Sequence, residues 1–326
     1  MHEWELTKGA ISDYSKLIKL LPENQRCFHV HGSFGDVYIQ CAALKELIEW
    51  CGQLSIIVDP RYKRLVEHVF EGRARIIYAD GPYVNNLLAQ LGVFSSQNLL
   101  PTRMLPTVYP MIPECILSGA LQYSDFIRVV TDTRATGPFP QIENQKILNR
   151  EALNILEMAD APVGRTILIC ADNNSQRELP EDFWRLVIAS SIEVGLTPCL
   201  NEAGNLSSEG AKLLSDNNIK RLKVPPHLAV TLPSLAGSYV CGTNGFATIQ
   251  ALFNHSVRGI HFINGFILKD DMIPDKYGNE IPLSRFFHGN CYHGEFVGTQ
   301  IEAVAQSDMD RKCLEKMFSD TFGLAL

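Results

Sequence analysis

Short apolar runs alternate with amphipathic stretches along most of the chain. The runs are hydrophobic at consecutive positions, a pattern typical of parallel strands that are covered on both faces of a sheet. They predict strands at residues 27–30, 54–59, 74–79, 126–130, 166–171, 196–200, 219–224, 238–242 and 258–263. Their alternation with helical stretches favours a doubly wound α/β fold.

The stretches between these runs carry apolar residues at helical spacing. In residues 36–50, Val37, Cys41 and Leu44 fall on one stripe, as expected for a helix with one buried face. Further helices are predicted at residues 61–70, 83–92, 148–159, 180–194, 207–215, 227–236 and 245–254. The last segment, RKCLEKMFSDTFGLAL, also has a helical pattern, and a helix here can pack back across the first half of the chain.

The chain has 326 residues, more than one hydrophobic core usually serves, so two domains are expected. The strand–helix rhythm weakens around residues 97–125 and resumes cleanly at Thr166. A Pro-Gly break within residues 158–165 marks the predicted boundary. Residues 1–160 and 161–326 are therefore predicted to form two Rossmann-like domains that face each other across a cleft, with ligands at the carboxyl ends of the strands.

Composition narrows the functional classes. The chain is 46% hydrophobic and 20% charged, as in ordinary globular proteins, and its formal net charge of −7 argues against nucleic acid as a partner. It has no apolar stretch of membrane-spanning length, and its first residues are polar, unlike a secretory signal. Its nine cysteines are scattered without a CxxC pair, which is typical of reduced thiols. We therefore expect a cytoplasmic protein with at most peripheral contact with a membrane.

A glycine turn, GSFGD, follows the first predicted strand. It lacks the lysine and the spacing of a phosphate-binding P-loop, and it ends in Asp36 at the start of a helix. A carboxylate in this position can act as a general base that takes the proton of an attacking hydroxyl group. The alternative is that Asp36 caps the helix, where the helix dipole stabilises its anion. The acceptor side of such a site is predicted to include His31, Gly32, Ser33 and Gly35.

A second glycine turn, CGTNGFAT, lies between the predicted strand at 238–242 and the predicted helix at 245–254. Backbone N–H groups at a helix start suit a diphosphate, because they lack partners within the helix and the dipole favours an anion. The alternative is an ordinary strand–helix turn in which Asn244 is left-handed. The residues predicted to bind a donor here are Gly242, Thr243, Asn244, Gly245 and Thr248.

A polar loop, DNNSQR, follows the predicted strand at 166–171. Its Arg177 can offset a phosphate or sugar-acid charge, and Asn173 is predicted to join it on the donor side. Alternatively, Arg177 forms a weak surface pair with Glu178 or Glu181.

A histidine-rich segment, FFHGNCYHGEF, offers His288, Cys291 and His293 at a spacing compatible with zinc, but no fourth ligand lies nearby in the sequence. We interpret this segment as part of a cleft rim and predict no metal. The GxSxG motif is absent, which disfavours a Ser-His-Asp hydrolase.

Together, the three motifs resemble those of the family-nine glycosyltransferases, the ADP-heptose:lipopolysaccharide heptosyltransferases. FGDVYIQCAAL resembles the family's early Gly-Asp turn, RELPEDFWRLV its middle loop and helix, and GTNGFATIQAL its late turn and helix. The sequence departs from the family pattern at Leu179, Thr243 and Thr248, where the family has tryptophan, aspartate and histidine. The last two contact donor groups in the family, so the departure leaves room for another sugar or another nucleotide.

The resemblance implies a GT-B fold, with the acceptor bound by the first domain and a nucleotide-diphosphate sugar by the second. It implies an inverting transfer without metal or cofactor, in which Asp36 is catalytic, Arg177 helps to hold the donor and Gly245 belongs to the late turn. The implied acceptor is a saccharide, a lipid-linked molecule or a protein, in lipopolysaccharide biosynthesis at the inner face of the inner membrane. Two alternatives stay open: a sugar-nucleotide epimerase or hydrolase on the same scaffold, and a non-catalytic relative that binds a nucleotide sugar.

Overall fold

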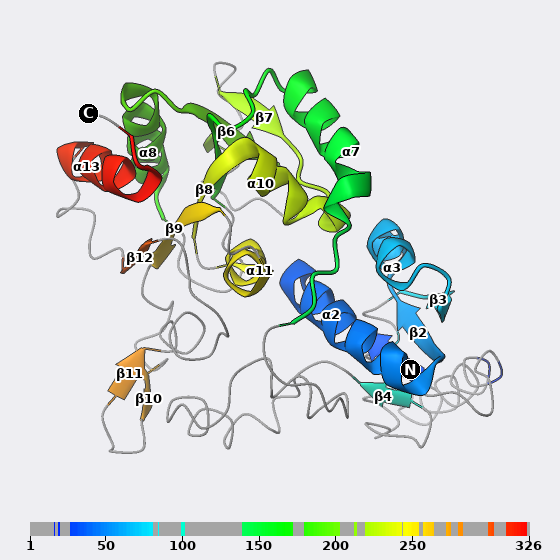
Figure 1. The fold of residues 1–326 in the computed structure, drawn as a ribbon. Helices are drawn as coiled ribbons and strands as arrows, with labels where there is room; N and C mark the ends of the chain where they lie inside the picture. Colours follow the sequence, from blue (N-terminus) through cyan, green and yellow to red (C-terminus); the bar gives the residue numbers. More distant parts are fainter. Residues whose placement is uncertain are drawn as a thin grey trace, which may run out of the picture. The chain divides into compact units, whose positions relative to one another are not determined.

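The computed structural model describes residues 27–80, 139–171, 179–202, 219–242, 244–253, 257–263 and 311–324, with short pieces at 16, 19, 84, 99–101, 212–213, 272–274, 280–282 and 299–302. The chain divides into two compact units, whose helices and strands are labelled in Figure 1. Unit 1 comprises Met1–Tyr109 and Ser124–Ile142, and unit 2 comprises Pro110–Tyr123 and Glu143–Leu326.

Unit 1 is built on a parallel sheet with the strand order β3-β2-β1-β4. Its strands are β1 (Cys27–Val30), β2 (Leu54–Val58), β3 (Ala74–Tyr78) and β4 (Leu99–Pro101). β1 and β2 are buried throughout, which fits their continuous apolar sequence. The helix α2 (Phe34–Cys51) leads from β1 to β2, and η1 (Pro60–Tyr62) with α3 (Lys63–Phe70) leads from β2 to β3.

The helix α2 is buried more completely than predicted. Every residue from Val37 to Leu44 is buried, and exposed residues appear only in the later turns. The single buried stripe was therefore wrong for the first half of this helix. Its small residues Cys41, Ala42 and Ala43 allow neighbouring segments to approach closely, and a helix that is apolar all round belongs inside a protein.

Unit 2 is built on a larger parallel sheet with the order β12-β9-β8-β5-β6-β7. Numbered along the chain within this sheet, the order is 3-2-1-4-5-6, that of a Rossmann sheet. The order reverses between β5 and β8, and ligands of such sheets bind outside the carboxyl ends of the strands at that reversal. The strands are β5 (Thr166–Cys170), β6 (Thr197–Asn201), β7 (Lys220–Leu222), β8 (Gly237–Gly242), β9 (Arg258–Ile263) and β12 (Thr299–Glu302), with a separate hairpin of β10 (Met272–Pro274) and β11 (Glu280–Pro282).

Two apolar clusters surround the sheet of unit 2. One contains Leu148, Leu156 and Leu232, and joins α7 (Gln145–Met158) and α10 (Thr231–Ala236) to the sheet; Figure 1 draws these helices side by side. The other contains Trp184 and Phe318, and joins α8 (Glu181–Glu193) and α13 (Arg311–Phe322) to the sheet. The remaining elements described here are η3 (Pro226–Leu228) and α11 (Gly245–Phe253).

The last helix belongs to unit 2. Its buried residues Leu314 and Phe318 pack in the same cluster as α8, and the Arg311 guanidinium forms an ion pair with Glu193 at the end of α8. The structure thus accounts for the apolar face of α13 within unit 2, where the sequence analysis considered packing on the first half of the chain.

The segment before α7 is attached to unit 2 by a buried carboxylate. Glu143 accepts hydrogen bonds from Val230 N (2.8 Å), Thr231 N (2.7 Å) and Thr231 Oγ1 (2.6 Å). These bonds satisfy N–H groups at the start of α10. The helix α7 therefore lies in unit 2, although the sequence analysis placed residues up to 160 in the first domain. The Pro-Gly break is the turn between α7 and β5.

The predicted elements can be compared with the structure only where it is described. The strands at 27–30 and 258–263 are found with their predicted bounds, and most others shift by one or two residues. The predicted helix at 227–236 is divided into η3 and α10, in a stretch that contains Pro226 and Pro233. The predicted strand at 126–130 and nearly all of the predicted helices at 83–92 and 207–215 lie outside the described residues.

Candidate functional site

The turn between β1 and α2 places Asp36 in the first turn of the helix. Ser33 is the residue that precedes the helix, and Asp36 Oδ2 accepts hydrogen bonds from Ser33 N (2.9 Å) and Ser33 Oγ (2.8 Å). This is the acidic half of a capping box, so the predicted cap interaction is present. It uses one carboxylate oxygen: Oδ1 has no hydrogen-bond partner among the described residues. Asp36 is half-buried, and its role as a base stays a prediction.

Two contacts explain why this turn needs its glycine and its geometry. Gly32 has φ +129°, and a Cβ atom there would lie 2.7 Å from Asp36 Oδ2, so a larger residue would collide with the carboxylate. The buried side chain of Gln40 bonds to both backbone groups of His31, with His31 N to Gln40 Oε1 at 3.3 Å and Gln40 Nε2 to His31 O at 2.8 Å. The path from strand to helix is therefore fixed before and after the turn.

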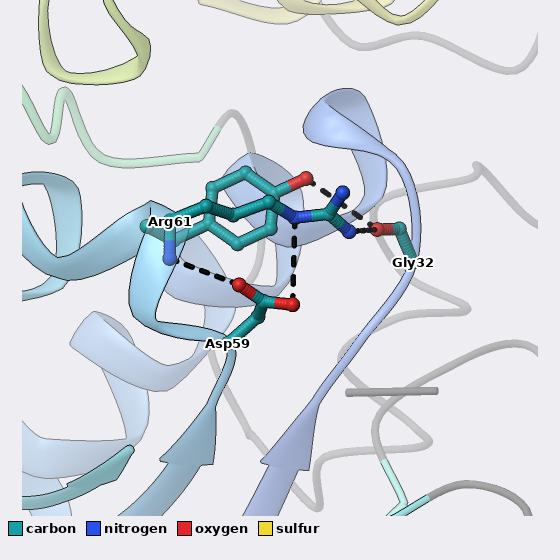
Figure 2. A network of polar contacts seen from close by, with 4 residues as sticks. Gly32, Asp59 and Arg61 are labelled. Atoms are coloured by element: carbon teal, nitrogen blue, oxygen red, sulfur yellow. Dashed lines mark hydrogen bonds and ion pairs between the residues drawn. The ribbon is translucent and has the colours of Figure 1, made fainter. Parts of the chain in front are cut away.

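A further group of contacts joins the turn to the next strand–helix corner. Figure 2 shows the Gly32 carbonyl oxygen facing Arg61, whose Nη2 donates to it at 3.3 Å; Tyr62 Oη donates to the same oxygen at 3.5 Å. Asp59, which follows β2, caps η1 by accepting from Arg61 N at 2.9 Å. Arg61 is not among the site residues predicted from the sequence. The signal that could have identified it is its position just after β2, the strand that pairs with β1.

The two histidines near the end of β1 are stacked, with ring centroids 5.1 Å apart and planes inclined by 12°. Burial, together with the nearby His31, lowers the pKa of His29 to about 3, so His29 is neutral at physiological pH. His31 is itself buried in the turn. Its predicted place on the acceptor side, like those of Gly32, Ser33 and Gly35, stays a prediction.

The turn between β8 and α11 is organised by Asn244. Its Oδ1 accepts from Ala247 N (2.9 Å), and its Nδ2 donates to the Cys170 carbonyl oxygen at the end of β5 (3.4 Å). Thr248 Oγ1 donates to the Asn244 carbonyl oxygen at 3.3 Å. The two side chains predicted as donor ligands are therefore engaged in building the turn, and Asn244 joins the two strands at which the sheet order reverses.

Among the described residues, the backbone N–H groups at the start of α11 have fewer hydrogen-bond partners than the side chains of this turn. Within the described chain, the N–H groups of Gly245 and Phe246 have no hydrogen-bond partner, and α11 has no acidic residue in its first turn. Such a start favours an anion. Gly242 is buried at the end of β8, whereas the predicted donor residues Asn173, Arg177 and Thr243 lie outside the described residues.

Only part of the metal and membrane predictions can be compared with the structure. His288, Cys291 and His293 lie outside the described residues, and the remainder of the chain that the structure describes holds no cluster of three metal-ligating side chains. Among the helices described, none is long and apolar enough to cross a membrane.

Comparison with known proteins gives a clear result only for the fold. No protein-family model and no curated protein sequence matches the chain. Two successive Rossmann-type sheets define a GT-B fold, as predicted, and solved structures of that class match nearly the whole chain.

Three of the matching structures are glycosyltransferases, two of them heptosyltransferases. ADP-heptose lps heptosyltransferase II of E. coli is 10% identical, over 91% of this chain and 98% of its own, with a TM-score of 0.56. A family 9 glycosyl transferase from Veillonella parvula is 11% identical, over 93% and 98%, with a TM-score of 0.52. E. coli heptosyltransferase WaaC with ADP is 12% identical, over 91% and 99%, with a TM-score of 0.51. The expected resemblance to these enzymes is confirmed for the fold.

Proposed function

We propose that this protein is a glycosyltransferase that moves a sugar from a nucleotide-diphosphate sugar to a hydroxyl group of a saccharide, lipid-linked or protein acceptor. The observation that supports this best is a pair of strand–helix turns with opposite chemistry. One presents a carboxylate oxygen, Asp36 Oδ1, and the other presents the unpartnered N–H groups of Gly245 and Phe246. Sugar transfer needs both a base and stabilisation of a departing diphosphate.

In the proposed reaction, Asp36 Oδ1 accepts the proton of the acceptor hydroxyl group as its oxygen bonds to the anomeric carbon. Ser33 holds Oδ2, so the carboxylate keeps one orientation. The bond from the anomeric carbon to the diphosphate breaks on the opposite side, which inverts the configuration. The N–H groups and dipole at the start of α11 stabilise the diphosphate without a metal ion.

The donor nucleotide is proposed from the structural neighbours. E. coli WaaC is described with ADP and with an ADP-2-deoxy-2-fluoro heptose, so ADP-linked heptoses are the first donors to examine. The threonines at 243 and 248 replace the acidic residue and the histidine of the resembled family, which makes a different sugar the main variation to include.

A second candidate is a non-catalytic protein that binds a nucleotide sugar. Its support is that Asp36 already has a structural role, because Oδ2 accepts two hydrogen bonds from Ser33. A cap of this kind would be retained even if catalysis were lost.

Calorimetry with ADP, GDP and UDP on the full chain tests nucleotide binding, which both candidate functions require. We expect one nucleoside diphosphate to bind, and failure of all three to bind would contradict both. Incubation with the matching sugar nucleotides and simple saccharide acceptors, followed by mass spectrometry, then separates them. Transfer that persists in EDTA supports the metal-independent enzyme. Donor that is converted without an acceptor, and without transfer when one is present, indicates an epimerase or hydrolase. Binding without any conversion indicates the non-catalytic protein.

A further inference from the structure

The peptide unit between Gly32 and Ser33 is held at both ends. Its carbonyl oxygen accepts from Arg61 Nη2 (3.3 Å) and Tyr62 Oη (3.5 Å), and its N–H group donates to Asp36 Oδ2 (2.9 Å). A trans peptide unit is planar and rigid, with its C=O and N–H groups pointing in opposite directions. Fixing the oxygen therefore fixes the direction of the N–H group that orients the Asp36 carboxylate.

The donors on the carbonyl side are themselves well placed. Arg61 and Tyr62 follow β2, which pairs with β1 in parallel, so their corner and the glycine turn meet at the same edge of the sheet. The Arg61 guanidinium lies over the Tyr62 ring, with Cζ 4.8 Å from the ring centroid, and Nε is 3.7 Å from Asp59 Oδ2. Figure 2 shows Asp59 and Gly32 on two sides of the guanidinium. An exposed arginine is thereby kept in one orientation.

Arg61 and Tyr62 are chemically suited to donate hydrogen bonds to the Gly32 carbonyl oxygen. Burial raises the pKa of Tyr62 to about 12, so its hydroxyl group stays protonated and available to donate. Arginine is always charged and carries several N–H groups in a fixed plane. A cationic donor on the oxygen of a peptide unit also polarises its N–H group, which strengthens the hydrogen bond from that N–H to a carboxylate.

We infer that Arg61 and Tyr62 are positioning residues for Asp36: they hold the Gly32 carbonyl oxygen, and through the Gly32–Ser33 peptide unit they orient the carboxylate. This inference rests on the proposed function for its catalytic consequence, but its structural part stands by itself. Gly32 (φ +129°) has no Cβ atom to restrict its backbone, so the direction of the following peptide unit depends on these contacts.

The first experiment measures the turn directly. Hydrogen-exchange mass spectrometry on peptides that cover residues 30–37 would compare the wild-type chain with Arg61→Met, Arg61→Lys and Tyr62→Phe. We expect exchange to rise about tenfold in Arg61→Met and by less in Tyr62→Phe and Arg61→Lys, since loss of a hydrogen bond to a charged group has the larger effect. Lys63→Met is the matched control, because Lys63 is an exposed cation in the same corner that pairs with Glu67 instead. Unchanged exchange in Arg61→Met would overturn the inference.

The second experiment uses the donor and acceptor that the nucleotide screen identifies. Loss of positioning should lower kcat about tenfold in Arg61→Met, leave the acceptor KM unchanged, and be partly restored in Arg61→Lys. A raised acceptor KM with unchanged kcat would overturn the inference, because it would make Arg61 a substrate contact. If the wild-type chain transfers no sugar while Arg61→Met still loosens the turn, the proposed function fails but the orientation of Asp36 by Arg61 is supported.

Discussion

The two strand–helix turns that follow β1 and β8, at the points where the sheet orders reverse, differ in the chemistry of their helix starts. In unit 1, the third residue of α2 is Asp36, whose carboxylate occupies the helix start. In unit 2, the third residue of α11 is Ala247, whose N–H group is satisfied by Asn244, and the two preceding N–H groups are open within the described chain. The comparison teaches that one side chain at the third helical position decides whether such a turn presents a negative charge or receives one.

The largest expected effect comes from removing the charge in unit 1. Asp36→Asn keeps an oxygen that can accept from Ser33 but removes the base, so kcat should fall by about 10² to 10⁴. Donor affinity, measured by calorimetry, should stay the same. Asp182→Asn, which removes an exposed acid from the first turn of α8, is the control for the loss of a charge at a helix start. Undiminished transfer by Asp36→Asn would end the assignment of different roles to the two turns.

Acid should weaken unit 1 through His29, which lies in β1 before the first turn, whereas β8, before the second turn, contains no histidine. The folded pKa of His29 is about 3, below its ordinary 6.5, so between these values the unfolded chain binds a proton that the folded chain refuses. Stability conferred by neutral His29 is therefore complete above pH 6.5 and falls by about 1.4 kcal/mol per pH unit as the pH drops toward 3. Hydrogen exchange of β1 peptides in urea at pH 7 and pH 5 would measure this slope. His29→Gln should flatten it, and an equal slope in that variant would contradict the prediction.

The glycine of the first turn should matter more than an ordinary turn glycine. Gly32→Ala must accommodate both the positive φ and a contact at 2.7 Å with Asp36 Oδ2, so we expect a loss of about 1–3 kcal/mol in the free energy of unfolding. Gly52→Ala is the matched control, because Gly52 also has positive φ (+77°) but has open space around it. Thermal unfolding of both variants would isolate the contact with the carboxylate. Equal losses would show that this contact costs nothing.

The smallest expected effect is on the unit 2 turn. Gly245→Pro removes one backbone N–H group at the first helical position, where proline is well tolerated. Nucleoside diphosphate affinity should fall about tenfold, because a hydrogen bond to an anion is lost, while the melting temperature hardly changes. Gln145→Pro, at the first position of α7, is the control for the substitution itself. Unchanged affinity would remove the diphosphate from the start of α11.

The fold was predictable because its signals are local. Buried parallel strands read as continuous apolar runs, and a glycine turn after such a run marks the start of a helix, as at Gly32 and Gly245. The GT-B prediction followed from two series of these units in one chain. The bounds of the units were harder, because α7 is placed by α10, which lies far along the sequence.

The site was predictable only in part. The start of a helix at Asp36, its capping contact and the second turn followed from local pattern, whereas the roles of these residues in a reaction stay predictions. The roles of Asn244 and Thr248 in building the turn, and the contact of Arg61 with Gly32, depend on which strand ends lie together. Arg61 is 29 residues from Gly32 in the sequence, and no periodicity connects them.

The burial of α2 limits how this protein can vary. From Val37 to Leu44 the helix has no outward side, so a saturation library should tolerate few replacements there and many at exposed Glu49 or Trp50. Asp36 is thus followed by a helical segment in which few substitutions should be tolerated. For the proposed transferase, we therefore expect changes of acceptor preference to arise in segments other than this helix.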